Sequence, residues 1–315
     1  MNEISIAITM DCEPTLETTH STATGPKDFA MSERAITGYF EIASTYGYPV
    51  TYFVHPETIR VQADLFKELA SRGACIGLHM HPWKYSQWRY QSTRYREHFG
   101  QLSYAEQVAL LAEAAALWRD AMGEQPLYFR PGTFSANDAT FRALLDTGFR
   151  GGSISAPGRV YREIRSVWTG TEPDPHRTNP EFRMAVGQMP LGNMPLSADF
   201  SRLLDMGSGR YLHPDFRPDI DWMTRFGIDY KTISDNILAQ VLERKPAIPV
   251  LNSISHNHYN YSDRADPQCQ RYLVMLENMT AACDRRGLKA VGTTVGAIVE
   301  RVLETDPVDE EFCFF

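Results

Sequence analysis

Acidic, imidazole and guanidinium side chains stand at the ends of four short apolar segments of this sequence. The segments are ITMDCEP with Asp11 and Glu13, LHMHP with His79 and His81, YFRPG with Arg130, and SISHNH with His256 and His258. Side chains two residues apart on an extended chain point the same way. Each pair can therefore converge on one point if the fold brings the four segment ends together.

Carboxylates and imidazoles gathered in this way suit a borderline divalent ion such as zinc, with positions left open for water and substrate. Such an ion makes a bound water acidic enough to attack near neutral pH, and it polarises a carbonyl oxygen. A second carboxylate could take the proton of the water, and a histidine on the opposite side could protonate the leaving group. These parts predict metal-assisted hydrolysis of an amide or an ester.

Short apolar runs with strand character alternate with segments of helical periodicity along most of the chain. The expected strands cover residues 3–10, 49–55, 74–81, 127–132, 149–155, 248–256 and 288–294. Helices between consecutive strands imply parallel pairing with right-handed crossovers. We expect an α/β fold, a distorted (β/α) barrel of seven or eight parallel strands. The polar segment ends then share one rim, where barrels of this kind keep their active sites.

Several helix boundaries are signalled by their capping residues. Ser32 offers an N-cap to the helix that follows the first strand. Ser103 and Glu106 have the spacing of a capping box, and Gly123 is suited to end the same helix. A further helix is expected over residues 135–147.

The alternation of strands and helices breaks between residues 156 and about 230. This stretch is rich in Pro, Gly, Asp and Arg, and it predicts a long irregular excursion after the fifth strand, with short strands that shape the substrate site. One barrel strand is expected inside it, at residues 184–191. Side chains of the excursion could also enter the site, and the candidates are Asp199, Asp205, His213 and Asp221. We expect a single domain over residues 1–315, with the excursion as an insertion.

Composition limits the partners and the compartment. The formal net charge is -8, and the 31 basic residues are scattered, which disfavours nucleic acid or an anionic membrane as partner. No apolar run approaches the length of a membrane span. The five cysteines form no CxxC pair, and the first residues enter a strand without a signal-peptide pattern. We therefore expect a cytoplasmic protein.

Five motifs, in order, resemble those of the polysaccharide deacetylase family, carbohydrate esterase family 4, with its chitooligosaccharide-deacetylase homology domain. ITMDCE resembles the first motif of the family, VTYFVH its Thr-Phe-Phe-Val strand, CIGLHMH its Gly-Xaa-His motif, YFRPGTFSANDATFRALLDTGF its Arg-Pro motif, and SISH its final Leu-Xaa-His motif. The resemblance runs from the first strand to the last helix and leaves the excursion unmatched. It implies a distorted β/α barrel that hydrolyses N-acetyl or O-acetyl groups on sugars with a divalent metal.

The resemblance also implies a role for each matched residue. Asp11 would be the general base, and Arg130 would orient it. Glu13 and His79 would be metal ligands, and His256 would be the general acid. The implied metal is zinc, with cobalt or nickel as alternatives.

The chain departs from the family pattern at two positions. Cys12 stands where the family commonly has its second acid, so an Asp-Xaa-Glu variant with Glu13 as ligand is adopted. Trp83 stands where a second histidine is usual, and His81 is the available substitute in a His-Xaa-His motif. Cys12 is itself a rival ligand because thiolate binds zinc well, although it alternates out of phase with its two acidic neighbours.

Other residues are candidates for the outer part of the site. His55 ends the second expected strand and could be a spare ligand, although a strand end before a helix explains it nearly as well. His258 is a further spare histidine. Trp83 and Tyr85 could stack on a sugar ring or pack their segment down, and Pro131 belongs to the Arg-Pro motif and is expected to contact the substrate.

Together these residues predict a cytoplasmic, metal-dependent carbohydrate deacetylase. It would remove an acetyl group, N-acetyl rather than O-acetyl, from a sugar, an oligosaccharide or a precursor used in polysaccharide biosynthesis. Two alternatives remain open. One is an amide hydrolase of the same fold that acts on a non-sugar substrate, and the other is an inactive barrel that binds a glycan or a partner without turnover.

Overall fold

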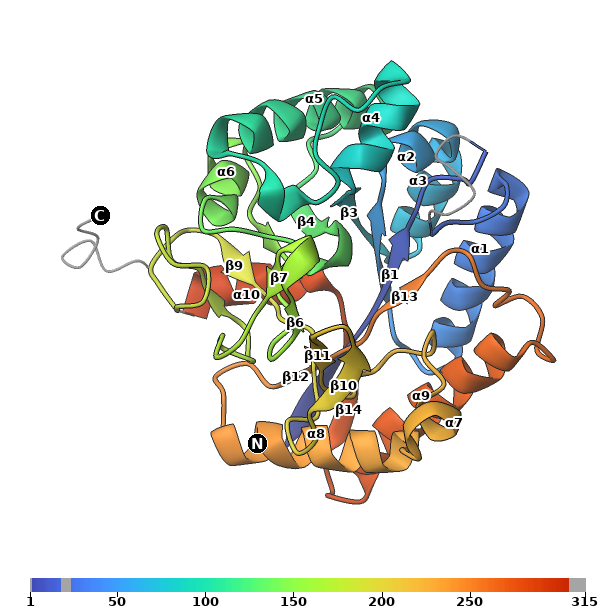
Figure 1. The fold of residues 1–315 in the computed structure, drawn as a ribbon. Coiled ribbons are helices and arrows are strands. Elements are labelled where there is room, and N and C mark those ends of the chain that lie inside the picture. Colours follow the sequence, from blue (N-terminus) through green and yellow to red (C-terminus); the bar gives the residue numbers. More distant parts are fainter. Residues whose placement is uncertain (1, 18–23, 306–315) are drawn as a thin grey trace.

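A curled sheet of ten strands forms the centre of the protein in the computed structural model, which describes residues 2–17 and 24–305 (Figure 1). The strand order is β12 (Val250–Asn252), β1 (Glu3–Cys12), β2 (Val50–Val54), β3 (Cys75–Met80), β4 (Tyr128–Pro131), β5 (Gly151–Gly152), β9 (Gly192–Asn193) and β8 (His176–Arg177). Two more strands, β13 (Ser255–His256) and β14 (Lys289–Thr293), also pair with β1. Every pair in this sheet is parallel except β8 with β9. The expected α/β class with a curled parallel sheet is confirmed.

The two ends of the sheet approach each other through side chains. Among the described residues, the strand ladder of β12 runs to β1 alone. Asn252 of β12 spans the gap: its backbone amide donates to Ser197 Oγ at 2.8 Å, and its Nδ2 donates to the carbonyl oxygen of Pro195 at 2.9 Å. Nδ2 also donates to Ser153 Oγ at 3.1 Å. The sheet is therefore a half-barrel whose open side is bridged by a polar seam.

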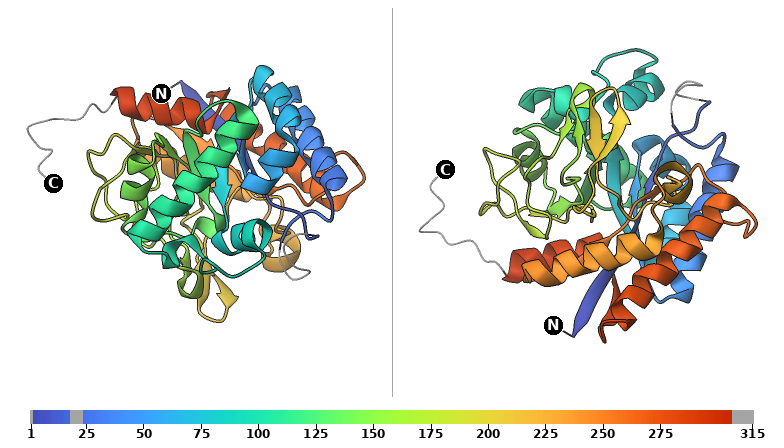
Figure 2. Two further views of the ribbon diagram at one scale, coloured as in Figure 1. Left: turned by 90° about the horizontal axis from the view of Figure 1, so that it is seen from above. Right: turned by 60° about the horizontal axis from the view of Figure 1, so that its bottom comes forward.

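Helices surround the curled sheet, as two further views show (Figure 2). They are α1 (Phe29–Thr45), α2 (Pro56–Val61), α3 (Ala63–Ser71), α4 (Pro82–Tyr90), α5 (Tyr104–Met122), α6 (Thr140–Asp146), α7 (Trp222–Phe226), α8 (Tyr230–Arg244), α9 (Pro267–Asp284) and α10 (Val295–Thr305). Short 3-10 turns are η1 (Phe99–Gln101), η2 (Gly132–Phe134) and η3 (Arg162–Ile164). No helix within the described ranges is long and apolar enough to cross a membrane.

Most of the central strand β1 is buried, and apolar side chains cover both of its sides. In the middle of the strand, Ala7 joins a small apolar cluster with Phe53 of β2 and Val299 of α10. The buried polar residues of β1, Thr9 and Asp11, both lie in its second half. Asp11 therefore stands close to the carboxyl end of the strand, where parallel strands place their site residues.

The excursion between residues 156 and 230 contains a second sheet of four strands. Its order is β10 (Leu204–Gly207), β11 (Arg210–Leu212), β6 (Val160–Tyr161) and β7 (Ser166–Val167), and its pairs are antiparallel. The strand expected at residues 184–191 is wrong. Val186 there makes only an isolated bridge to Thr178 and is half exposed, whereas the strand that joins the main sheet is β9, a Gly-Asn pair just beyond.

Two predicted helix starts also need correction, and one helix is confirmed. Asp28, not Ser32, caps α1, because its side chain accepts a hydrogen bond from the amide of Met31 at 2.7 Å. The helix expected from residue 135 begins only at Thr140, since Asn137 Oδ1 holds the preceding residues in a turn by accepting from the amide of Ala139. The capping box and the left-handed glycine expected for α5 are both present.

Candidate active site

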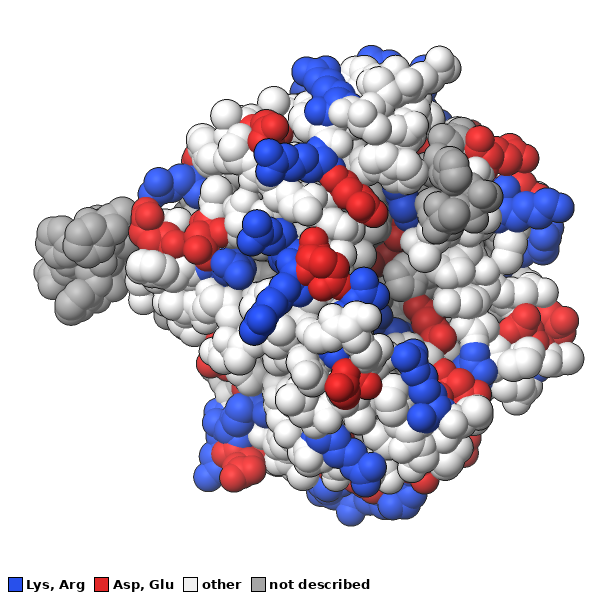
Figure 3. Space-filling model, in the orientation of Figure 1, with Lys and Arg blue, Asp and Glu red and all other residues white. Residues whose placement is uncertain are grey.

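The polar side chains at the strand ends gather at one rim of the main sheet. Asp11 of β1 lies in register with His256 of β13, and His79 of β3 lies in register with Arg130 of β4. Asp11, His79 and Arg130 are almost completely buried. The space-filling view shows a hollow at the centre of the face seen in Figure 1, with acidic and basic side chains side by side around it (Figure 3).

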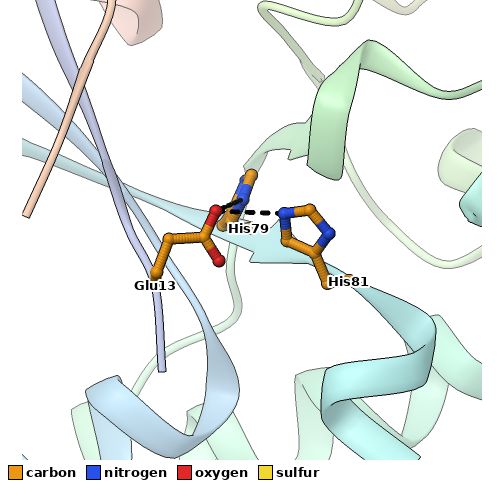
Figure 4. A group of neighbouring side chains, drawn as sticks. All are labelled: Glu13, His79 and His81. Carbon is orange, nitrogen blue, oxygen red and sulfur yellow. Dashed lines mark hydrogen bonds and ion pairs between the residues drawn. The ribbon is translucent and has the colours of Figure 1, made fainter. Parts of the chain in front are cut away.

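Glu13, His79 and His81 form a compact group that we call the metal cluster (Figure 4). Glu13 Oε1 lies 3.0 Å from His81 Nε2 and 3.4 Å from His79 Nε2, and the three ligand atoms lie within 4.8 Å of one another. Ligand atoms about 2.0–2.1 Å from a tetrahedral zinc ion stand about 3.3 Å apart. The spacing of the metal cluster therefore fits a divalent ion of that size.

The orientation of His79 favours metal binding. Its Nδ1 lies 3.0 Å from the carbonyl oxygen of Arg130, which can only accept a hydrogen bond. In the neutral form of the imidazole, the hydrogen therefore sits on Nδ1, and the lone pair of Nε2 faces the carboxylate of Glu13. Burial lowers the pKa of His81 to about 4, which favours its neutral form. Two imidazoles and a carboxylate form a donor set that zinc, cobalt and nickel all accept.

Hydrogen bonds to its side chain and to its backbone fix the position of Glu13. Lys84 Nζ donates to Glu13 Oε2 at 2.7 Å, on the oxygen that does not face the histidines. Asn257 accepts from the Glu13 amide at 2.8 Å and donates to its carbonyl at 3.1 Å. Burial opposes ionisation of the carboxyl, but its histidine neighbours and Lys84 hold the pKa of Glu13 well below its usual value. The carboxylate is therefore charged and fixed in place.

Asp11 forms a buried ion pair with Arg130. Arg130 Nη1 donates to Asp11 Oδ1 at 2.8 Å and to Thr9 Oγ1 at 2.8 Å, and its guanidinium lies over the ring of Phe53 at 4.3 Å. The other oxygen, Asp11 Oδ2, lies 3.9 Å from His79 Nδ1. Arg130 thus fixes one carboxylate oxygen and leaves the second one next to the metal cluster.

His256 is paired with Asp219, a residue that sequence reasoning missed. Asp219 Oδ2 lies 2.5 Å from His256 Nδ1, and Ser255 Oγ donates to Asp219 Oδ1 at 2.7 Å. Burial disfavours the imidazolium, but Asp219 outweighs it, so the pKa of His256 is raised above its usual value. Burial likewise opposes ionisation of Asp219, yet His256 keeps the pKa of that carboxyl low. Asp219 therefore favours the imidazolium form of His256.

The candidates proposed from the excursion lie elsewhere. Asp199 accepts from Ser201 and Gln240, Asp205 accepts from the Gly207 amide, His213 contacts the Arg202 carbonyl, and Asp221 caps α7. Nothing in the local sequence RPDIDWM distinguishes Asp219 from Asp221, because only the packing of the excursion against β13 decides which one meets His256. The sequence did not identify Lys84 as a site residue either, because its burial depends on tertiary contacts.

Three further candidates lie close to the site with other surroundings. Cys12 is fully buried in the apolar core, and burial, with the charges of Asp11 and Glu13, raises the pKa of its thiol well above the usual value, so it stays a neutral thiol outside the metal cluster. His55 caps α2 by accepting from the Glu57 amide at 3.3 Å. His258 lies beside His256, with ring centroids 5.3 Å apart.

The three residues expected to contact the substrate differ in how far they are buried. Trp83 is partly exposed and lines a cavity of about 460 Å³ together with His81, Lys84 and Thr133. Tyr85 is fully buried and packs edge-on against Trp88 at 5.8 Å, which agrees with the alternative that it packs its segment down and not with stacking on a sugar ring. Pro131 is buried at the end of β4. Trp83 is thus the aromatic residue of this set that is open to a ligand.

The protein is an α/β half-barrel with a candidate metal cluster at the rim that the strand ends form. Residues 2–152 match the model of the polysaccharide deacetylase family. This match covers a little under half of the chain and contains the first four of the five motifs that resemble this family, whereas SISH lies beyond it. No curated protein sequence matches the chain.

Solved structures share the fold at low sequence identity. A Parabacteroides distasonis protein proposed to be a glycoside hydrolase or deacetylase has a TM-score of 0.66 at 11% identity, over 98% of this chain and 72% of the other. A Mycobacterium smegmatis protein proposed to be a polysaccharide deacetylase has a TM-score of 0.57 at 15% identity, over 96% and 91%. Puue allantoinase has a TM-score of 0.57 at 11% identity, over 98% and 93%. These likenesses establish the fold.

Proposed function

We propose that this protein is a metal-dependent deacetylase that hydrolyses an N-acetyl group on a sugar, an oligosaccharide or a polysaccharide precursor. The match of residues 2–152 to the polysaccharide deacetylase family model supports the reaction class. The observation that carries the proposal is the register pairing of Asp11 with His256. It puts a carboxylate and an imidazole on neighbouring strands, both beside the metal cluster.

The metal cluster would hold the ion through Glu13 Oε1, His79 Nε2 and His81 Nε2. A divalent ion bound there supplies a Lewis acid for the acetyl carbonyl and lowers the pKa of a water molecule. Zinc suits the donor set, and cobalt or nickel are the alternatives to screen. Lys84 keeps the second oxygen of Glu13 engaged, so this carboxylate would offer one oxygen to the ion.

Asp11 acts as the general base in this proposal. Because Arg130 engages Oδ1 at 2.8 Å, Oδ2 is the oxygen that accepts the proton of the attacking water. The salt bridge fixes the direction of the carboxylate. Arg130 is fully buried, so bulk water does not compete for this contact.

His256 acts as the general acid. Asp219 binds Nδ1, which leaves Nε2 to carry a proton toward the departing amine nitrogen. Asp219 raises the pKa of His256 above its usual value, which favours the protonated form that a general acid needs. Trp83, at the wall of the neighbouring cavity, offers an aromatic face on which a sugar ring can stack.

The test is acetate release from N-acetylated mono- and oligosaccharides by protein reconstituted with zinc, cobalt or nickel. Metal-dependent release by the wild type, lost in Asp11→Asn and kept in Asp221→Asn, is the expected result. Hydrolysis of non-sugar amides alone would favour an amide hydrolase. Tight glycan binding without any acetate release would favour an inactive binding barrel and overturn the proposal.

A further inference from the structure

The buried acids around the site each have a cation of their own. The pairs are Asp11 with Arg130 at 2.8 Å, Glu13 with Lys84 at 2.7 Å, Asp219 with His256 at 2.5 Å, and Asp215 with Arg217 at 2.7 Å. In each pair one positive group meets one negative group. These four pairs are therefore close to charge balance, and a further buried cation has no carboxylate of its own among them.

Arg159, from the excursion, is such an additional charge. Arg159 is only 6% exposed. Within the described ranges, no carboxylate oxygen lies within 4 Å of its guanidinium nitrogens. Its Nη1 donates to the carbonyl oxygen of Thr133 at 3.2 Å, and its guanidinium lies over the rings of Phe134 and Tyr161 at 5.0 Å and 5.3 Å. Aromatic faces and one carbonyl stabilise a guanidinium far less than a carboxylate does.

The position of Arg159 ties it to the catalytic rim. Thr133 and Phe134 belong to the Arg-Pro motif, and the guanidinium groups of Arg130 and Arg159 lie 5.4 Å and 5.0 Å from the centroid of the Phe134 ring. Thr133 also lines the cavity that contains His81. Arg159 is thus one ring away from the arginine that holds the general base.

The turn that receives Arg159 is strained. Thr133 and Phe134 have φ values of 56° and 55°, in the left-handed region that non-glycine residues rarely adopt. Trp168 Nε1 donates to the Phe134 carbonyl at 2.8 Å and, with the bond from Arg159, holds the turn. Such strain is typically retained where a functional geometry requires it.

The charge of Arg159 persists at neutral pH. Burial and the neighbouring Arg217 lower the pKa of its guanidinium to about 10, while Asp215 and Asp11 act in the opposite direction. Arg217 is engaged by Asp215 through both Nε, at 3.2 Å, and Nη2, at 2.7 Å. Of the two arginines, Arg159 therefore has the free donors that a ligand can use.

We propose that Arg159 is a specificity residue that binds an anionic group, a carboxylate or a phosphate, carried by the acetylated sugar. This inference rests on the proposed function, since it assigns the substrate class of the same site. A planar guanidinium with free N–H groups recognises either anion by paired hydrogen bonds. The natural substrate would then be an acidic N-acetylated sugar, such as an N-acetylhexosaminuronic acid or an N-acetylhexosamine phosphate.

The test compares three substrates: N-acetylglucosamine, its 6-carboxylate analogue N-acetylglucosaminuronic acid, and N-acetylglucosamine 6-phosphate. We expect the wild type to prefer one of the two anions in kcat/KM, and Arg159→Met to lose about tenfold to a hundredfold on that anion alone. Arg159→Lys should restore part of the preference. The preferred anion shows whether the charged group of the substrate is a carboxylate or a phosphate.

The matched control is Arg202→Met, which removes an exposed arginine of the same excursion. It should leave the preference unchanged. An equal loss on all three substrates in Arg159→Met, with a lower melting temperature, would mean that Arg159 only supports the fold and would overturn the inference. If Arg159→Met does not fold, Arg159→Gln, which is polar but uncharged, gives the same comparison.

Binding separates this inference from the proposed function. Isothermal titration of the Asp11→Asn protein with the same three sugars measures preference without turnover. Tighter binding of an anion that Arg159→Met abolishes in this background supports the anion site even if the wild type releases no acetate. Equal affinity for all three sugars would overturn it.

Discussion

The carboxylate of Asp219 lies 2.5 Å from Nδ1 of His256, and the two residues come from the excursion and from β13, respectively. This contact sets the protonation of the proposed general acid. Because Asp219 raises the pKa of His256, the acid stays protonated to a higher pH than a free histidine would. Activity that needs the imidazolium is present below this pKa and is lost as pH rises through it.

Replacement of Asp219 by asparagine should move the alkaline limb of the kcat profile to lower pH. The pKa of His256 falls once burial acts without the compensating charge, and kcat near neutral pH should drop about tenfold to a hundredfold. The measurement is a pH profile of kcat. Asp221→Asn, at the cap of α7, is the matched control and should keep the wild-type limb. An unchanged limb in Asp219→Asn would remove His256 from the role of general acid.

Gly132 should be required for metal binding. A Cβ at this position would stand 2.4 Å from Nδ1 and 2.5 Å from Nε2 of His81, so an alanine must displace the ring from the metal cluster. We expect Gly132→Ala to weaken zinc binding at least tenfold by isothermal titration. Gly170→Ala places a left-handed residue in open space and should cost stability without changing zinc affinity. Wild-type affinity in Gly132→Ala would speak against His81 as a ligand.

Arg130 should be essential for stability. Arg130→Met leaves Asp11 buried with its charged partner removed, which should lower the free energy of unfolding by about 3–5 kcal/mol in urea denaturation. Arg142→Met, which breaks an exposed pair with Glu181, should change it by less than about 1 kcal/mol. Equal effects of the two substitutions would show that the Asp11 site is open to water.

Lys84 and the metal should act on the same carboxylate. Lys84→Met removes the buried cation at Glu13, so the metal-free variant should be about 3 kcal/mol less stable than the wild type. A bound divalent ion supplies the missing positive charge. Zinc should therefore raise the melting temperature more in Lys84→Met than in the wild type, while Lys231→Met, at the surface, should respond like the wild type. The opposite order would place the ion away from Glu13.

The sequence predicted the parts of the site that depend on local pattern. Apolar runs ending in Asp11, His79 and His256 are strands because their spacing and burial agree, and parallel strands necessarily share one rim. The two-residue spacing was enough to bring His81 to 3.0 Å from Glu13. Such features can be predicted because each depends on the sequence of a few neighbouring residues.

The rest of the site depends on packing between distant segments. Asp219, Lys84 and Arg159 are charged residues in irregular or helical sequence, and only tertiary contacts bury them beside the rim. The two-residue strand β9 was missed for a similar reason, since a Gly-Asn pair has little strand propensity of its own and is held by its neighbour β5. Long-range contacts of this kind leave no periodic trace in the sequence.

The metal content of the purified protein tests whether Glu13, His79 and His81 bind a divalent ion. Elemental analysis should be made on wild type, His79→Ala and Asp11→Asn after reconstitution with zinc, cobalt or nickel and removal of free metal. We expect about one ion per chain in the wild type and in Asp11→Asn, and none in His79→Ala. A wild type that retains no metal, or a His79→Ala variant that retains as much as the wild type, would contradict this expectation.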